Sequence, residues 1–343
     1  MLNYDPPMRL AVIGAGSWGT TVAAIASPNT DVILWARRPD LAERINRDRA
    51  NADYLPGYTL PSSLAATSDM EEALTGADLV VVGVPSHGYR AVLAKAKEMV
   101  PPSTPVVSLT KGIEMDTGLR MSEVTLQVLP GHDPGAVGVL SGPNLAVEIM
   151  EGQPAATVIA MGDPRAARRI QPVFTTPRFR VYTNPDVIGV EVAGAAKNVI
   201  AIAAGASTGL GFGMNTTASL VTRGLAEMTR LGIAMGGEAL TFGGLAGVGD
   251  LMATCGSSRS RNNRVGLQLG KGRGIEQIVS EMNMVAEGVK TTRAVLNLAE
   301  RHGVEMPIAE AVGGMLYEGQ TVHHAMASLM GREPTSEGHG IVL

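Results

Sequence analysis

The sequence predicts an α/β domain built on a doubly wound parallel sheet, followed by an all-α domain. Three observations lead to this prediction. Short apolar runs alternate with helical patterns through the first half of the 343 residues, a glycine-rich turn follows the first run, and strand signals nearly vanish after Asn184-Pro185. Alternation of strands and helices is typical of a parallel sheet. We therefore expect two domains, residues 1–188 and residues 189–343.

The individual elements follow from the same patterns. Buried strands are expected at Arg9–Ile13, Val32–Trp35, Leu79–Val84, Val106–Leu109 and Val137–Leu140, with Ala155–Ala160 and Phe179–Tyr182 extending the sheet. Between the strands, helices are expected at Thr20–Ala26 and Tyr89–Met99. The second domain has helical periodicity at Glu191–Gly205, Thr217–Leu231, Gly274–Met282, Lys290–His302 and Ile308–Glu318.

Composition excludes several classes of function. The net charge is −4 and no basic stripe appears, so nucleic acid is not an expected partner. Cys255 is the only cysteine, which excludes an internal disulfide and a multi-cysteine metal site, and we expect no metal. The N-terminus lacks a signal-peptide core. The apolar stretch 187–206 contains Glu191, Lys197 and Asn198, so we expect a buried helix rather than a membrane span, in a cytoplasmic protein.

The turn after the first strand predicts a dinucleotide site. Gly14-Ala15-Gly16-Ser17-Trp18-Gly19 is a G-x-G-x-x-G between a strand and a helix, the context that makes a Rossmann-like cofactor site rather than a glycine-rich turn without a ligand. Gly14 permits the turn, Gly16 admits a pyrophosphate, and Gly19 lets the helix pack on the strand. The second strand ends in Arg37 and Arg38 where an NAD site usually has an acid. Arginine accepts a 2′-phosphate, so NADP is preferred over NAD unless the two arginines are only solvated loop charges.

Two lysines are candidates for the chemistry. Lys111 follows a predicted strand at the carboxyl edge of the sheet, where ligands bind, although a surface lysine would fit the position as well. Lys197 lies among small and apolar residues on all faces of a predicted helix, and Glu191 is not an i,i+4 partner. Desolvation lowers the pKa of a lysine, which suits proton transfer near neutrality. The alternative is a lysine that reaches solvent from a core helix.

A polar stretch, residues 247–264, is predicted to be a phosphate-binding loop. It contains two glycines, several hydroxyls and three arginines. Asp250 is expected either to orient a lysine or to bind a hydroxyl, and Cys255 to be structural. The alternative is a disordered polar loop.

The sequence resembles the NAD(P)-dependent glycerol-3-phosphate dehydrogenase family, bacterial type, from about Ala11 to about Gly331. The motifs that carry this resemblance are Gly14-to-Thr20, Val84-Pro85-Ser86-His87, Thr110-Lys111-Gly112, Ser141-Gly142-Pro143, Ala196-Lys197-Asn198-Val199, Thr222-Arg223-Gly224-Leu225-Ala226-Glu227, Gly249-Asp250-Leu251 and Ser260-Arg261-Asn262. The resemblance implies a helical C-terminal domain like that of 6-phosphogluconate dehydrogenase, and a homodimer. It assigns cofactor binding to the first domain and substrate binding to the second.

The resemblance also implies roles for individual residues. Lys197 is the expected acid/base. The implied substrate contacts are Lys111, Gly142, Lys197, Asp250, Ser260, Arg261 and Asn262, with Arg261 as the phosphate anchor. The implied cofactor contacts beyond the glycines and Arg37–Arg38 are Ser17, Trp18, Lys111, Ala146, Arg261, Val285 and Glu287. Asn144 departs from the family, which commonly has a small hydroxyl residue there, so a side-chain contact at this position is not carried over.

The function implied is reversible hydride transfer between NAD(P)H and dihydroxyacetone phosphate, giving sn-glycerol 3-phosphate for phospholipid synthesis. Two alternatives stay open. One is a hydroxyacid dehydrogenase of the 6-phosphogluconate or hydroxyisobutyrate type, and the other is a non-catalytic NADPH-sensing module, which would leave Lys111, Lys197 and Arg261 without a role.

Overall fold

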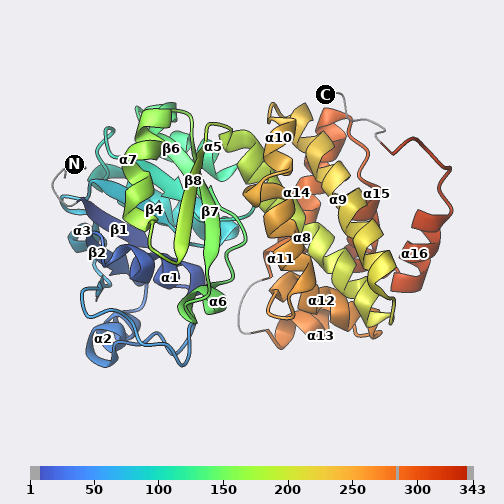
Figure 1. Ribbon diagram of the computed structural model, residues 1–343, viewed down its shortest axis with the longest axis horizontal. Coiled ribbons are helices and arrows are strands. Elements are labelled where there is room, and N and C mark those ends of the chain that lie inside the picture. Colours follow the sequence, from blue (N-terminus) through green and yellow to red (C-terminus); the bar gives the residue numbers. More distant parts are fainter. Residues whose placement is uncertain (1–7, 283–285, 338–343) are drawn as a thin grey trace. The chain divides into compact units, whose positions relative to one another are not determined.

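The computed structural model describes residues 8–282 and 286–337, which form two compact units (Figure 1). Unit 1 holds the chain up to Thr110 and residues Met121–Val187, and unit 2 holds Lys111–Arg120 and the chain from Ile188 onward. The expected division at 188/189 counted residues 111–120 with the first domain. The structure instead places this segment in the helical unit.

Unit 1 is organised around one sheet of eight strands. Their order is β3 (Ala65–Thr67), β2 (Asp31–Trp35), β1 (Arg9–Ile13), β4 (Leu79–Val82), β5 (Val106–Ser108), β6 (Val137–Ser141), β7 (Ala155–Met161) and β8 (Phe179–Asn184). The strands β1 and β4 are fully or almost fully buried, as expected for apolar runs covered on both faces of a parallel sheet.

The sheet departs from the prediction at two places. The strand β7 runs antiparallel to β6, with Leu140 opposite Ile159, whereas all strands were expected to be parallel. Strand β3 at one edge was not predicted, because its three residues are too few to show a period.

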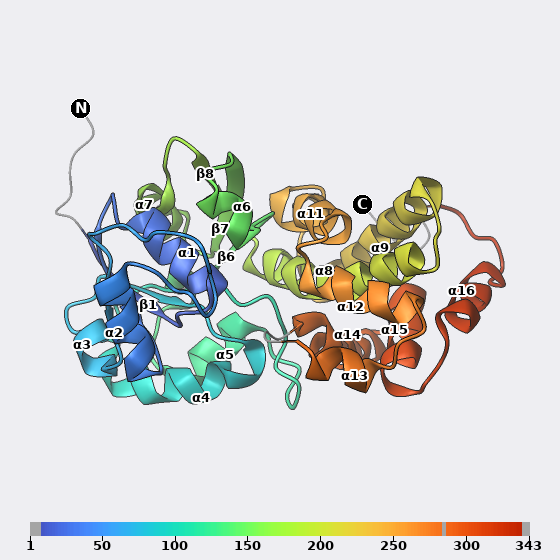
Figure 2. The same ribbon diagram turned by 90° about the horizontal axis from the view of Figure 1, so that it is seen from below.

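Helices cover both faces of this sheet. The helices are α1 (Ser17–Ala26), α2 (Pro39–Asp48), α3 (Met70–Leu74), α4 (Ser86–Ala96), η1 (Lys97–Met99), α5 (Met121–Val128), η2 (Pro134–Ala136), α6 (Ala146–Met150) and α7 (Pro164–Phe174). The helices α1 and α7 lie against one face, and α4 and α5 against the other (Figure 2). This is the doubly wound arrangement that the alternation of strands and helices predicts.

The described part of unit 2 consists of helices and the loops between them, together with the segment 111–120, in which Ile113 and Arg120 form one antiparallel bridge. Its elements are α8 (Val187–Gly209), α9 (Met214–Ala234), α10 (Ala239–Phe242), a π-helical turn η3 (Leu245–Gly249), α11 (Asp250–Gly256), α12 (Arg261–Gly270), α13 (Ile275–Ser280), α14 (Glu287–His302), α15 (Pro307–Tyr317) and α16 (Val322–Met330).

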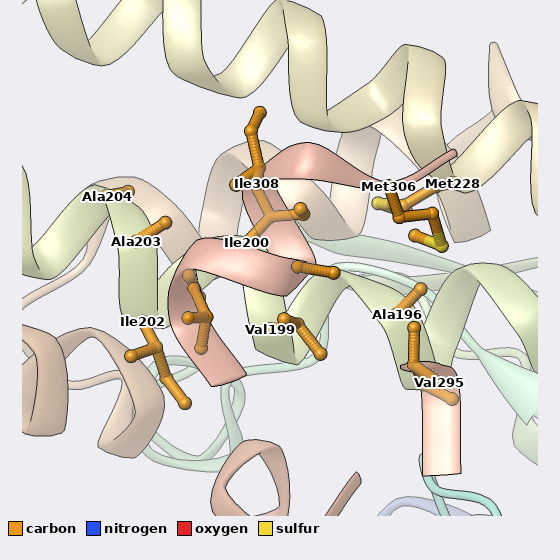
Figure 3. Close-up of a cluster of buried hydrophobic side chains, with 14 of the residues drawn as sticks. Ala196, Val199, Ile200, Ile202, Ala203, Ala204, Met228, Val295, Met306 and Ile308 are labelled. Atoms are coloured by element: carbon orange, nitrogen blue, oxygen red, sulfur yellow. The ribbon is translucent and has the colours of Figure 1, made fainter. Parts of the chain in front are cut away.

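The helix α8 forms the core of unit 2. Every residue from Gly189 to Ser207 is buried. Its apolar side chains, such as Ile200, pack with Met228 of α9, Val295 of α14 and Ile308 of α15 (Figure 3). The helix is long and apolar enough to cross a membrane by length and composition, but 89% of its most apolar window is buried by the rest of the protein. Burial on all sides explains why this sequence shows no polar stripe.

The predicted loop over residues 247–264 is wrong. These residues form the end of η3, the helix α11 and the start of α12, with only residues 257–260 between the two helices. Polar residues that suggested a loop also occur at helix ends. The Ser260 hydroxyl accepts a hydrogen bond from the Asn263 N–H and thereby caps α12.

Candidate active site

The glycine turn between β1 and α1 has the geometry of a phosphate cradle. Gly14 has a φ of 117°, and a Cβ there would lie 2.7 Å from the Gly83 carbonyl oxygen. A Cβ on Gly19 would lie 2.0 Å from the Gly14 oxygen, so only glycine lets α1 approach the turn. At Gly16 a Cβ would meet nothing within 4 Å, so the space beside the helix N-terminus is open. No side chain caps α1, and the first turn of a helix attracts an anion through its N–H groups. These residues fit a dinucleotide.

Ser17 and Trp18 open the helix α1 directly after this turn. The Ser17 hydroxyl donates to the Tyr54 carbonyl oxygen at 2.5 Å. The Trp18 ring packs against Phe179 with 6.4 Å between centroids. Ala146 begins α6 and is half-buried, and Val285 lies outside the described residues. All the predicted cofactor residues from 14 to 38 thus follow the carboxyl ends of β1 and β2.

The two arginines after β2 differ in their partners. Arg38 forms an ion pair with Asp53, and Arg44 of α2 reaches the same carboxylate at 2.9 Å. Arg37 is exposed, and within the described part of the chain it has no ion pair. The sequence treated both arginines alike, but the structure leaves Arg37 as the one whose charge is not already neutralised.

In unit 2, a carboxylate lies between two lysines. Asp250, at the start of α11, accepts hydrogen bonds from Lys111 Nζ and from Lys197 Nζ, each at 2.6 Å. The side chains are 2% exposed for Asp250, 6% for Lys197 and 16% for Lys111. Residues far apart in the sequence therefore meet in one charged cluster. Of the two roles considered for Asp250, contact with a lysine is the one observed.

Thr254 belongs to the same cluster and was missed from the sequence. Its hydroxyl accepts from Lys197 Nζ at 2.6 Å and donates to the Asp250 carbonyl oxygen at 2.6 Å. The signal was the i,i+4 spacing of Asp250 and Thr254, which places both on one face of a helix. It was hidden because residues 247–264 were predicted to be a loop.

The surroundings of Lys197 determine its pKa. Desolvation lowers the pKa of Lys197 to about 8, Asp250 opposes this, and the nearby Lys111 ammonium lowers it further. The amine therefore exchanges its proton close to neutrality, as a group that both donates and accepts protons requires. Burial also raises the pKa of the neighbouring Cys255 to about 12, so its thiol stays protonated and unreactive, as expected of a structural cysteine.

Two asparagines connect this cluster to the start of α12. The Asn198 amide donates to the Lys111 carbonyl oxygen at 3.0 Å, and its oxygen accepts from the Asn262 amide at 2.8 Å. The Asn262 oxygen in turn accepts from the Gly288 N–H at 3.0 Å, in the first turn of α14. The predicted substrate residue Asn262 thus also joins α8, α12 and α14.

Arg261 lies at the first position of α12, next to these bonds. The residue is exposed, and the charge of Glu287 at the start of α14 acts on its guanidinium. An arginine remains charged at any physiological pH. A cation at a helix N-terminus gives an anion both a charge and backbone N–H groups.

The comparisons with known proteins cover both units. The family model described as the N-terminus of NAD-dependent glycerol-3-phosphate dehydrogenase matches residues 9–167, and the model of its C-terminus matches residues 186–327. The chain belongs to this family. The relatives in the NAD-dependent glycerol-3-phosphate dehydrogenase family include glycerol-3-phosphate dehydrogenase [NAD(P)+] 2 of Sphingopyxis alaskensis, 53% identical over 97% of this chain and 99% of the relative. The glycerol-3-phosphate dehydrogenase [NAD(P)+] of Corynebacterium glutamicum is 52% identical over 96% of this chain and 100% of the relative.

Solved structures of the family have the same fold. The glycerol-3-phosphate dehydrogenase of Coxiella burnetii superposes with a TM-score of 0.90 at 36% identity, covering 95% of this chain and 99% of that one. A ketopantoate reductase of Ralstonia eutropha, 18% identical with a TM-score of 0.55 over 94% of this chain and all of its own, shares the fold alone.

The family's predicted substrate contact at Gly142 follows β6 in unit 1. Gly142 has a φ of 154°, and a Cβ there would lie 3.0 Å from the Thr157 Cα, so the backbone approaches β7 closely. The Asn144 amide donates to the Thr157 hydroxyl at 2.9 Å. The residue that departs from the family pattern is therefore tied to the sheet in unit 1.

Proposed function

We propose that this protein catalyses the reversible reduction of dihydroxyacetone phosphate to sn-glycerol 3-phosphate with NAD(P)H. The observation that carries the proposal is the buried cluster of Lys111, Asp250 and Lys197, with Lys197 titrating near neutral pH. A purely structural role would not require this burial, because burying the charge of a lysine costs free energy. An acid/base needs it, since the burial brings the pKa into the working range.

Lys197 carries the proton in this mechanism. When bound, the cofactor supplies the hydride for reduction and accepts it in oxidation. The Lys197 ammonium stabilises the charge that develops on the C2 oxygen and donates its proton to that oxygen. In the oxidation direction the neutral amine accepts the hydroxyl proton. Asp250 accepts hydrogen bonds from both lysines and orients them, and Lys111 lowers the pKa of Lys197.

Arg261 is proposed to bind the substrate phosphate. Arg261 is an exposed residue at the start of α12, and the parallel N–H groups of a guanidinium match phosphate oxygens. Ser260 and Asn262, on either side, hold the helix start in place through their hydrogen bonds to Asn263 and Asn198. The phosphate of a small substrate supplies much of its binding energy, which orients the reacting carbon.

The finer assignments are also proposals. NADP(H) is preferred over NAD(H), supported by Arg37, whose charge is not neutralised by an ion pair within the described residues. The protein acts in the cytoplasm as a homodimer, supported by the family resemblance, and supplies glycerol 3-phosphate to phospholipid synthesis.

A spectrophotometric assay tests the function directly. Oxidation of NADPH should depend on dihydroxyacetone phosphate, and glycerol 3-phosphate should be the product. A hydroxyacid dehydrogenase would instead turn over a hydroxyacid, and a sensing module would bind NADPH without consuming it. Either result would refute the proposal.

A further inference from the structure

The segment 111–120 folds back on itself within unit 2. Ile113 and Arg120 form an antiparallel bridge, and the Glu114 N–H donates to the Leu119 carbonyl oxygen at 2.9 Å. Ile113 is 2% exposed and belongs to the hydrophobic core of unit 2. The two ends of the segment are therefore joined, and Lys111 lies two residues from the bridge.

The segment is attached to the helix α8 at two points. The Arg120 guanidinium donates to the Glu191 carboxylate at 2.7 Å, and the Asn198 amide donates to the Lys111 carbonyl oxygen at 3.0 Å. These two points are seven residues apart on α8, about 10 Å along its axis. Lys197 lies between them in sequence. Two attachments at this spacing fix both the position and the direction of the segment along the helix.

The Arg120–Glu191 pair is buried, with side chains that are 12% and 3% exposed. A buried ion pair is weak evidence for stability, because the loss of hydration offsets the attraction, and apolar replacements are often neutral or stabilising. Its geometric effect is different: the pair fixes Arg120, the bridge fixes Ile113 to Arg120, and Lys111 follows within two residues.

We propose that Arg120 and Glu191 are positioning residues that hold Lys111 against Asp250 and thereby set the proton affinity of Lys197. This inference rests on the proposed function. Among the described residues, Asp250, Lys111 and Cys255 are the charged and titratable groups with the largest effects on Lys197. Moving the Lys111 ammonium away removes one positive neighbour and leaves the carboxylate more available to Lys197. Both changes stabilise the protonated amine, so the pKa of Lys197 rises.

The test replaces the pair by apolar residues, as Arg120→Met with Glu191→Leu in the full-length protein. The expected result is a melting temperature close to the parent's, because the two opposite charges of the buried pair are removed together. kcat should fall by about 10- to 100-fold, the cost of a displacement of about 1 Å within an active site. The basic limb of the pH profile for glycerol 3-phosphate oxidation should shift to higher pH than in the parent.

A double-mutant cycle shows whether the pair acts through Lys111. In a Lys111→Met background, replacing the pair should cost no further kcat, since the group it positions is already absent. The matched control is Arg332→Met with Glu305→Leu, an ion pair at 3.0 Å whose side chains are 47% and 69% exposed, which should leave kcat and the pH profile unchanged.

Each outcome decides the matter. Parent-like kcat and pH profile in the paired variant, or losses that add to that of Lys111→Met, would overturn the positioning role. Absence of turnover in the parent would refute the proposed function and this inference with it. If the paired variant does not fold, Glu191→Asp, which keeps the charge but withdraws the carboxylate by one methylene, is measured in the same way.

Discussion

Replacing Lys197 by methionine separates the chemistry of this site from its stability. Methionine keeps the length and apolar character of the side chain within the core helix α8. The pKa of Lys197 falls from 10.5 to about 8 on folding, which corresponds to a cost of about 3 kcal/mol that the substitution removes. This net value already includes the attraction of Asp250, which opposes the desolvation. The substitution removes the net cost and leaves Asp250 with its hydrogen bond from Lys111, so the variant should fold.

The effect on turnover should be far larger. Proton transfer contributes a factor of about 10²–10⁴, and stabilisation of the developing oxyanion adds to it, so we expect kcat to fall by at least about 10³. The parent should also show a basic limb near the pKa of Lys197, about 8. Oxidation of glycerol 3-phosphate needs the neutral amine and should rise with pH through this limb, and the residual activity of the variant should lack it.

The stability of the two proteins should depend differently on pH. Between about 8 and 10.5 the unfolded parent binds more protons at this lysine than the folded parent does, so its free energy of unfolding rises with pH relative to the variant. The assays are turnover, NADPH affinity and melting temperature, with Lys271→Met, an exposed lysine on the same unit, as control. Turnover within about tenfold of the parent, with affinity and melting intact, would remove Lys197 from the chemistry. Lys111 would then be the better candidate.

Three further predictions concern the cofactor, the substrate and the fold. Arg37→Ala should weaken NADPH binding by about 1.5–3 kcal/mol and leave NADH binding unchanged. Arg38→Ala should have a smaller effect in the same titrations, because Arg38 is already paired with Asp53. Equal losses of affinity for both cofactors would contradict this prediction. Arg261→Ala should lower kcat/KM for dihydroxyacetone phosphate by about 10²-fold and that for unphosphorylated dihydroxyacetone much less; the same factor for both would exclude phosphate binding. Burial raises the pKa of Glu227 from 4.5 to about 7, although two backbone N–H groups at the start of α15 donate to its carboxylate and lower the pKa. Between pH 4.5 and about 7 the folded state therefore holds a proton that the unfolded state has lost, and the free energy of unfolding falls as pH rises through this range. Melting curves of Glu227→Gln across this range should lose that slope, and an unchanged slope would show that Glu227 does not titrate there.

The sequence determined the elements whose signal is local. The apolar runs at Arg9–Ile13 and Leu79 onward gave buried strands because a parallel sheet covered on both faces needs no polar alternation. Gly14, Gly16 and Gly19 located the cofactor turn, since the backbone geometry there admits no other residue at two of the three positions. Lys197 was identified as a candidate because small and apolar residues surround it on every face of the predicted helix, and desolvation lowers the pKa of a lysine.

Local signals also failed in identifiable places. Residues 247–264 carry the glycines and hydroxyls of a loop, yet they form helices because α11 and α12 bury Leu251 and Val265 in the core of unit 2. Tertiary packing overrode the local preference there. The antiparallel direction of β7 had no local signal either, because a buried strand has the same composition in both directions.

Only the tertiary structure decided which charges meet. Asp250 lies 53 residues from Lys197 and 139 from Lys111, and no periodicity relates positions so far apart. No periodicity relates Arg120 to Glu191 either, which lie 71 residues apart. Their ion pair attaches the segment Lys111–Arg120 to α8 of unit 2. The sequence shows which charged side chains would cost free energy to bury. The partners that offset this cost come from the packing of helices that are distant in the sequence.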